Sequence, residues 1–191
     1  MGRESRLRYA TKWQRSRDDV ERGQRRSRAG VEQRSSHGAR LRDYECPYTR
    51  ALELAIAQLR DDGANSFRYV FRYFPLREIH PHAELAAEAA ETVYTLGGPE
   101  VFWVMHDALF ANQDDLEPPS LERQATAAGV ASKPFRAALK AQRFATRIQR
   151  DVRSGLANGV DGTPSVFING ERYLGGRDVD SLREVVGNGA R

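Results

Sequence analysis

The chain contains a single cysteine, Cys46, within the sequence Cys46-Pro47-Tyr48-Thr49. An apolar helical pattern follows, and proline suits the first position of a helix, so Cys46 is expected at a helix N-terminus. Unpaired amides and the positive end of the helix dipole favour the thiolate there, which is the form that attacks disulfides. We therefore predict a nucleophilic thiol. The alternative is a small buried side chain, which is the usual role of a free cysteine.

A second feature lies far along the chain, where Thr163 and Pro164 directly precede the apolar run 165–168. A proline that follows a small polar residue and opens a strand favours a cis peptide bond. It also removes a backbone donor from the strand, which leaves an edge free for an extended substrate. We predict that Thr163 and Pro164 form the wall opposite Cys46.

Three sequence blocks carry a family resemblance, namely DYECPY (43–48), FRYFPL (71–76) and GTPSVFING (162–170). Together they resemble the DsbA-like thioredoxin-fold family. Residues 80–94 and 102–107 are similar to the helical insertion of that family. The similarity covers about residues 42–188 and includes the thioredoxin-like domains fused to sodium/proton antiporters.

The resemblance implies an α/β, thioredoxin-like fold with a helical insertion, at about residues 78–158, between its two halves. It also implies an active thiol at Cys46, a cis bond before Pro164, and substrate contacts from Pro47, Tyr48, Thr163 and Pro164. The substrate would be a protein or low-molecular-weight disulfide or thiol. No bound cofactor is expected, although glutathione or another external thiol would serve as co-substrate.

One departure from the family concerns Thr49, which stands where dithiol members have a second cysteine. An internal disulfide is therefore excluded, and monothiol exchange with an external thiol is what remains. We expect the Thr49 hydroxyl to donate a hydrogen bond to the thiolate. The expected function is a thiol–disulfide oxidoreductase or glutathione-dependent thiol transferase, and the alternative is a redox-inactive module that binds a peptide or protein.

The other elements follow from periodicity and turn signals. Leu52, Ile56 and Leu59 predict a helix that ends at Asp62-Gly63, and alternation over 66–74 predicts a strand. Helices are expected over 83–94, 99–112, 120–128 and 132–156, with Ser120 and Ser132 as N-caps. Asn169-Gly170 predicts a hairpin between 165–168 and 172–174, and Asp178 or Asp180 would cap a last helix.

The N-terminal segment differs from the rest of the chain in charge. Residues 1–42 hold thirteen bases and five acids, a net charge of +8, whereas residues 43–191 carry −4. Apolar residues are sparse in 1–41, so we expect a disordered basic arm followed by a domain over 42–188. Either a weak central strand over 39–44 is tolerated, or the arm is not native to the fold and reflects a misplaced start or shifted frame. Nucleic-acid binding is not expected, because no binding motif accompanies the charge.

Composition limits the remaining classes of protein. No apolar run is long enough to span a bilayer, and no signal-peptide pattern opens the chain, so a cytoplasmic protein is expected. His80 and His82 flank a proline and do not share a helix face, so no metal site is predicted. The sequence does not indicate an oligomeric state.

Overall fold

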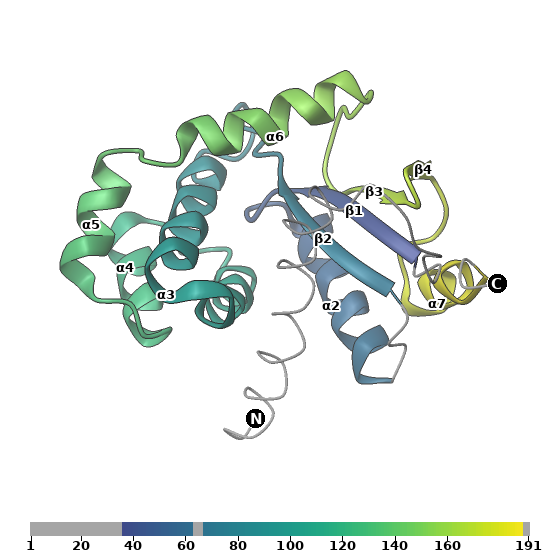
Figure 1. Cartoon of the computed structure of the whole chain (residues 1–191), viewed down its shortest axis with the longest axis horizontal. Coiled ribbons are helices and arrows are strands. Elements are labelled where there is room, and N and C mark those ends of the chain that lie inside the picture. The colour runs from purple at the N-terminus through teal and green to yellow at the C-terminus, as the bar shows by residue number, and fades with distance from the viewer. Residues whose placement is uncertain (1–35, 63–66, 189–191) are drawn as a thin grey trace, which may run out of the picture.

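A computed structural model describes residues 36–62 and 67–188 of the chain. A four-stranded sheet lies at the centre, with α2 and α7 beside it and a cluster of helices at one end (Figure 1). The disorder predicted for residues 1–35 lies outside the described residues. The elements, in chain order, are β1 (Ser36–Arg42), α2 (Pro47–Asp61), β2 (Phe67–Tyr73), α3 (Ala83–Ala111), α4 (Pro118–Ala127), α5 (Ser132–Lys140), α6 (Ala145–Ala157), β3 (Ser165–Ile168), β4 (Glu171–Tyr173) and α7 (Val179–Asn188).

The sheet has the strand order β2-β1-β3-β4. β1 and β2 are parallel, and α2 forms the crossover between them, as a parallel pair requires. β3 is antiparallel to both β1 and β4. Asn169 and Gly170 take positive φ values of 53° and 90°, which confirms the hairpin predicted from this pair.

The central strand β1 corrects the expected boundary of the domain. It begins at Ser36, so residues 36–41 belong to the sheet rather than to a separate arm. The strand pairs with β2 from Ser36 to Arg42 and with β3 from Gly38 to Leu41. This strand is defined by backbone hydrogen bonds to two neighbouring strands. The pattern of apolar residues in the sequence does not reveal such bonds.

Helix α2 follows from its sequence as predicted. Pro47 occupies the first turn, and Leu52, Ile56 and Leu59 are buried in a core cluster that also contains residues of β2 and α7. Each is fully or almost fully covered, so burial of this stripe contributes roughly 1.5 to 3 kcal/mol per side chain. The helix therefore fixes the position of the residue directly before it, which is Cys46.

The helical insertion lies between β2 and β3 and differs in detail from the pattern-based prediction. The break expected between the helices over 83–94 and 99–112 is confirmed, because α3 is interrupted at Gly98, whose φ of 82° is not helical, and Pro99 follows it. The caps predicted at Ser120 and Ser132 are wrong, because α4 already begins at Pro118 and Ser132 is the first residue of α5. The long helix expected over 132–156 is divided into α5 and α6.

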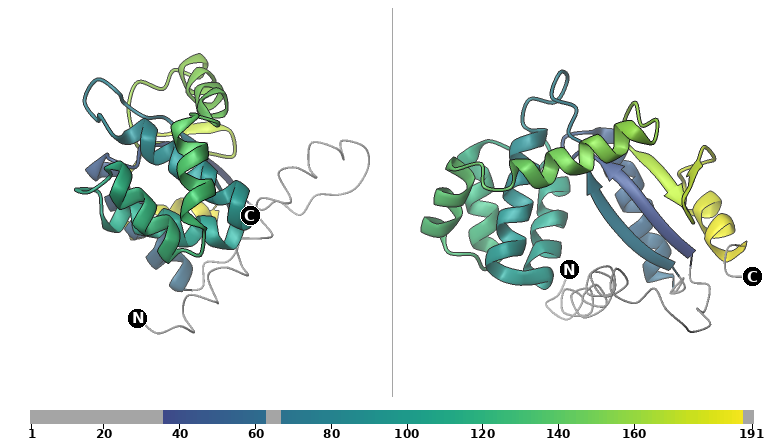
Figure 2. Two further views of the ribbon diagram at one scale, coloured as in Figure 1. Left: turned by 90° about the vertical axis from the view of Figure 1, so that its left-hand side faces the viewer. Right: turned by 45° about the horizontal axis from the view of Figure 1, so that its top comes forward.

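The insertion forms a cluster beside the sheet. Helices α3, α4 and α5 pack on one another, and α6 runs from this cluster back across the end of the sheet (Figure 2). Phe102, Trp103 and Met105 of α3 are buried, as expected for the core face of a helix. Of the helices in the described ranges, none is both long enough and apolar enough to cross a membrane.

Candidate functional site

The predicted nucleophile lies where the sequence placed it. Cys46 is the N-cap residue of α2, and its Sγ donates a hydrogen bond to the Thr163 carbonyl oxygen, 3.3 Å away. The Thr163–Pro164 peptide bond is cis, as expected. Two segments separated by 117 positions therefore meet at this sulfur. Cys46 is only 2% exposed, so the sulfur is covered in this conformation.

Thr49 is also at the site, but the bond predicted for it is absent. Its backbone amide donates to the Cys46 carbonyl over 3.1 Å, which forms part of the first helical turn. The side chain is fully buried, and among the described residues its Oγ1 has no hydrogen-bond partner. The predicted hydrogen bond from the Thr49 hydroxyl to the Cys46 sulfur is therefore not formed.

The other predicted substrate residues divide into exposed and buried positions. Tyr48 is 72% exposed and Pro47 is also exposed, so both stand on the surface beside the thiol. Pro164 is buried, whereas Thr163 is partly exposed. The Thr163 carbonyl is the group that faces the sulfur.

Gln113 is a site residue that the sequence analysis missed. Its Nε2 donates to the Tyr44 carbonyl oxygen over 2.6 Å and to the Cys46 carbonyl oxygen over 3.0 Å. The side chain thus ties the loop after α3 to the loop that carries the thiol. Nothing in the sequence around Gln113 indicated this role, because the contact joins residues more than sixty positions apart.

The Asp43 side chain also holds the thiol-bearing loop in place. One carboxylate oxygen accepts from the Glu45 amide and the other from the Leu76 amide, each over 2.8 Å. His80 Nδ1 lies 2.8 Å from the second oxygen. The Asp43 side chain is fully buried, so its charge is satisfied by these three groups rather than by water.

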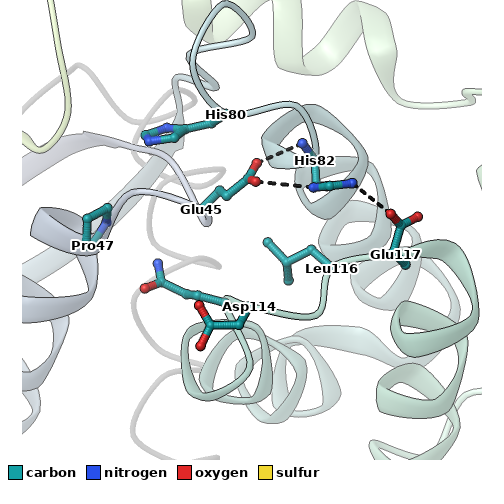
Figure 3. A pocket seen from close by; sticks show the side chains of 8 residues that line it. Glu45, Pro47, His80, His82, Asp114, Leu116 and Glu117 are labelled. Atoms are coloured by element: carbon teal, nitrogen blue, oxygen red, sulfur yellow. Dashed lines mark hydrogen bonds and ion pairs between the residues drawn. The ribbon is translucent and has the colours of Figure 1, made fainter.

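His82 forms a second bridge between the loop and the insertion. Its backbone amide donates to Glu45 over 2.7 Å, its Nδ1 lies 3.2 Å from the same carboxylate, and its Nε2 lies 3.1 Å from Glu117 (Figure 3). The hydrogen bond to Glu45 raises the pKa of His82 above its ordinary value; partial desolvation opposes this effect, and the Glu117 charge adds to it. His80 thus pairs with one carboxylate, that of Asp43, and His82 pairs with two, those of Glu45 and Glu117.

A pocket of about 460 Å³ opens beside the thiol-bearing loop. Figure 3 shows Glu45, His82 and Glu117 along one side, with Leu116 and Asp114 below them. Within the described ranges, no cluster of His, Cys, Asp and Glu side chains could hold a metal ion. The lining residues are Glu45, Pro47, His80, His82, Gln113, Asp114, Leu116 and Glu117.

A buried polar network lies in the core close to the loop. Arg42, the last residue of β1, forms an ion pair with Glu53 of α2, and Tyr69 donates to Glu53 over 2.6 Å. His106 Nδ1 shares a 3.0 Å hydrogen bond with the Tyr44 hydroxyl. Burial lowers the pKa of His106 to about 3, so this imidazole is neutral at ordinary pH. The network links β1, α2 and α3 and stabilises the start of the thiol-bearing loop.

The sequence comparisons support the same fold. The thioredoxin family model matches residues 40–188. Among curated relatives, a Na(+)/H(+) antiporter NhaA 3 of Salinispora tropica is 42% identical over 144 residues, or 75% of this chain and 22% of the antiporter. An antiporter NhaA of Herminiimonas arsenicoxydans is 32% identical over 144 residues, with the same shares covered. The chain thus spans about a fifth of the length of these relatives.

Solved structures give the same architecture. BdbD from Bacillus subtilis superposes with a TM-score of 0.74 at 20% identity, over 84% of this chain and 90% of that one. The thiol-disulfide exchange protein alpha-DsbA2 from Wolbachia pipientis gives 0.68 at 23% identity, over 98% and 99%. The match to the family model shows that the chain belongs to the thioredoxin family. The superpositions and the inserted helices show that its fold is DsbA-like.

Proposed function

We propose that this protein is a thiol–disulfide oxidoreductase that works through Cys46 alone. The observation that supports this most directly is the contact between Cys46 Sγ, at the N-terminus of α2, and the Thr163 carbonyl beside Pro164. This contact puts a thiol next to a backbone edge that an extended substrate could approach. The neighbouring structures named as thiol–disulfide oxidoreductases agree with this proposal.

The proposed reaction has two exchange steps. Cys46 loses its proton to solvent, and the thiolate attacks one sulfur of a substrate disulfide, so that a mixed disulfide forms and the other sulfur leaves as a thiolate. A second, external thiolate then attacks the mixed disulfide and releases Cys46. The bond broken in each step is replaced by the one formed, and the leaving thiolate takes up the proton.

The external thiol is required because Thr49 cannot resolve a mixed disulfide. A protein thiol or a low-molecular-weight thiol would serve. The Cys46 sulfur must become accessible for either step, since it is covered in the described conformation. A small movement of the thiol-bearing loop away from Thr163 would uncover it.

A redox-inactive binding module is the second candidate. The burial of Cys46 favours it, because an inert cysteine is typically a covered small side chain. The curated relatives favour it too, since their names are those of ion antiporters and the matching segment is only 22% of their length. In such a protein this domain would bind a peptide or another part of a transporter along the edge near Pro164.

Alkylation of Cys46 distinguishes the two candidates. The rate of reaction with iodoacetamide is measured against pH by intact mass, with the urea-unfolded chain as reference and Cys46→Ser as the blank. A redox thiol should show a midpoint below that of the unfolded chain and form a mixed disulfide with a small disulfide reagent. A rate that is low at every pH in the folded protein, but normal in urea, would support the binding module.

A further inference from the structure

We propose that the pocket beside Cys46 selects disulfides that carry a positive charge near the reacting sulfur and disfavours glutathione disulfide. This inference rests on the proposed function, because it concerns the substrate of the same thiol. It starts from the position of the pocket. Two lining residues, Glu45 and Pro47, are the immediate neighbours of Cys46, and a third, Gln113, donates to the Cys46 carbonyl.

The pocket lining is negative. Three carboxylates, those of Glu45, Asp114 and Glu117, belong to it, and it contains no lysine or arginine. Asp114 and Glu117 are exposed, so their charges act on anything that enters. The carboxylates come from two segments, namely the thiol-bearing loop and the loop between α3 and α4.

The histidines compensate only part of this charge. His80 is hydrogen-bonded to the buried Asp43 carboxylate, which is not part of the pocket lining. His82 lies between Glu45 and Glu117, so that a single imidazole serves two carboxylates. Within residues 36–62 and 67–188, Asp114 forms no ion pair with a base. Arg50, the nearest base along α2, is exposed and does not line the pocket.

The remaining lining suits an aliphatic side chain with a charged end. Both Pro47 and Leu116 line the pocket, and the exposed Pro47 ring presents apolar surface there, whereas Leu116 is buried. A lysine or arginine near a substrate cysteine would lay its methylene groups on this surface and its charge on the carboxylates. In glutathione, carboxylates outnumber ammonium groups, so the same field repels it.

The test compares three small disulfides as probes on the full chain. Cystamine is cationic, 2-hydroxyethyl disulfide is neutral, and oxidised glutathione is anionic. Formation of the Cys46 mixed disulfide is followed by intact mass, and each rate is divided by that of the same probe with 2-mercaptoethanol. We expect cystamine to exceed oxidised glutathione by on the order of tenfold at low salt, and the ratio to fall when salt shortens the screening length to about 3 Å at 1 M.

Two variants decide whether the pocket is the cause. The double variant Asp114→Asn with Glu117→Gln should lower the normalised ratio of the cystamine rate to the oxidised glutathione rate until 2-mercaptoethanol and the protein show the same preference. Glu184→Gln, on the exposed face of α7, should leave this ratio unchanged. Circular dichroism confirms that each variant is folded. Equal normalised rates for the three probes on the wild-type chain would overturn the charge selection while leaving the exchange function in place. If no probe reacts until the chain is unfolded, the proposed function itself fails.

Discussion

The two walls of the thiol site are held in different ways. The wall that carries Cys46 is bonded to the helical insertion through Gln113, His80 and His82. The wall that carries Thr163 is held by the sheet, through β3, and by a local bond in which Ser165 Oγ donates to the Gly162 carbonyl over 2.7 Å. The insertion therefore positions the nucleophile, and the sheet positions the group that faces it.

This difference implies that the two walls respond separately to substitution. Changes in the insertion should alter the reactivity of Cys46 more than the pairing of the strands. Changes around Ser165 should act on the facing wall and leave the helix start intact.

Substitution of Thr49→Cys should have the largest effect on redox activity, because it places a second thiol on the same wall as Cys46. The new side chain would lie in the first turn of α2, where the Thr49 hydroxyl is buried and has no partner among the residues that the structure describes. We expect insulin-reduction activity to rise from near zero by at least about tenfold, with an internal disulfide visible as a loss of two hydrogens by mass. Thr49→Ser is the matched control and should show no gain. A folded variant without gain would mean that the two thiols are not brought together.

Substitution of Glu53→Ala should destabilise the core that supports the Cys46 wall. It would remove the Glu53 carboxylate from its ion pair with the buried Arg42 guanidinium, and loss of one partner from a buried pair costs about 3 to 5 kcal/mol. Chemical denaturation measures the change in the free energy of unfolding. The surface control Glu184→Ala should stay within about 0.5 kcal/mol of the wild type. A small cost at Glu53 would show that water reaches the pair.

The pair Gln113→Met and Ser165→Ala tests the difference between the walls directly. Each removes side-chain hydrogen bonds of one wall, at a cost of roughly 1 to 2 kcal/mol for Gln113 and about 1 kcal/mol for Ser165. Gln113→Met should also change the alkylation rate of Cys46 severalfold, since it removes the side-chain bonds that tie the Cys46 loop to the insertion. If Ser165→Ala changes that rate as much, the two walls are not independent.

The pH dependence of stability should show the smallest effect. The pKa of His82 is raised in the folded state by its bond to Glu45, so the folded protein binds the proton more tightly than the unfolded chain. This contribution is fully present below about pH 6.5, the ordinary value for histidine, and is lost as the pH rises through the folded value. Denaturation midpoints of the wild type and His82→Gln, measured from about pH 5 to 9, should converge on the alkaline side. If the two midpoints differ by the same amount at every pH, protonation of His82 does not contribute to the stability of the fold.

The sequence predicted most of the fold and the chemical part of the site. The apolar stripe of α2, the Asn-Gly hairpin and the cap at Asp178, whose carboxylate accepts from the Ser181 amide, are local patterns, and each is confirmed. The start of β1 and the N-caps of α4 and α5 were missed. A strand with few apolar residues is defined by its neighbours in the sheet, and Pro118 opens α4 earlier than the serine signal suggested.

What the sequence determined by itself is the pair of segments that make the site, because a cysteine before a helical stripe and a proline before a strand are local features. The tertiary structure alone decided how these segments are held. Gln113, Asp43 and His82 act through contacts between residues that are far apart in the chain. The fully buried Thr49 hydroxyl has no partner in the part of the chain that the structure describes. Hydrogen bonds between distant segments depend on how the helices pack, and no periodicity along the chain encodes that packing.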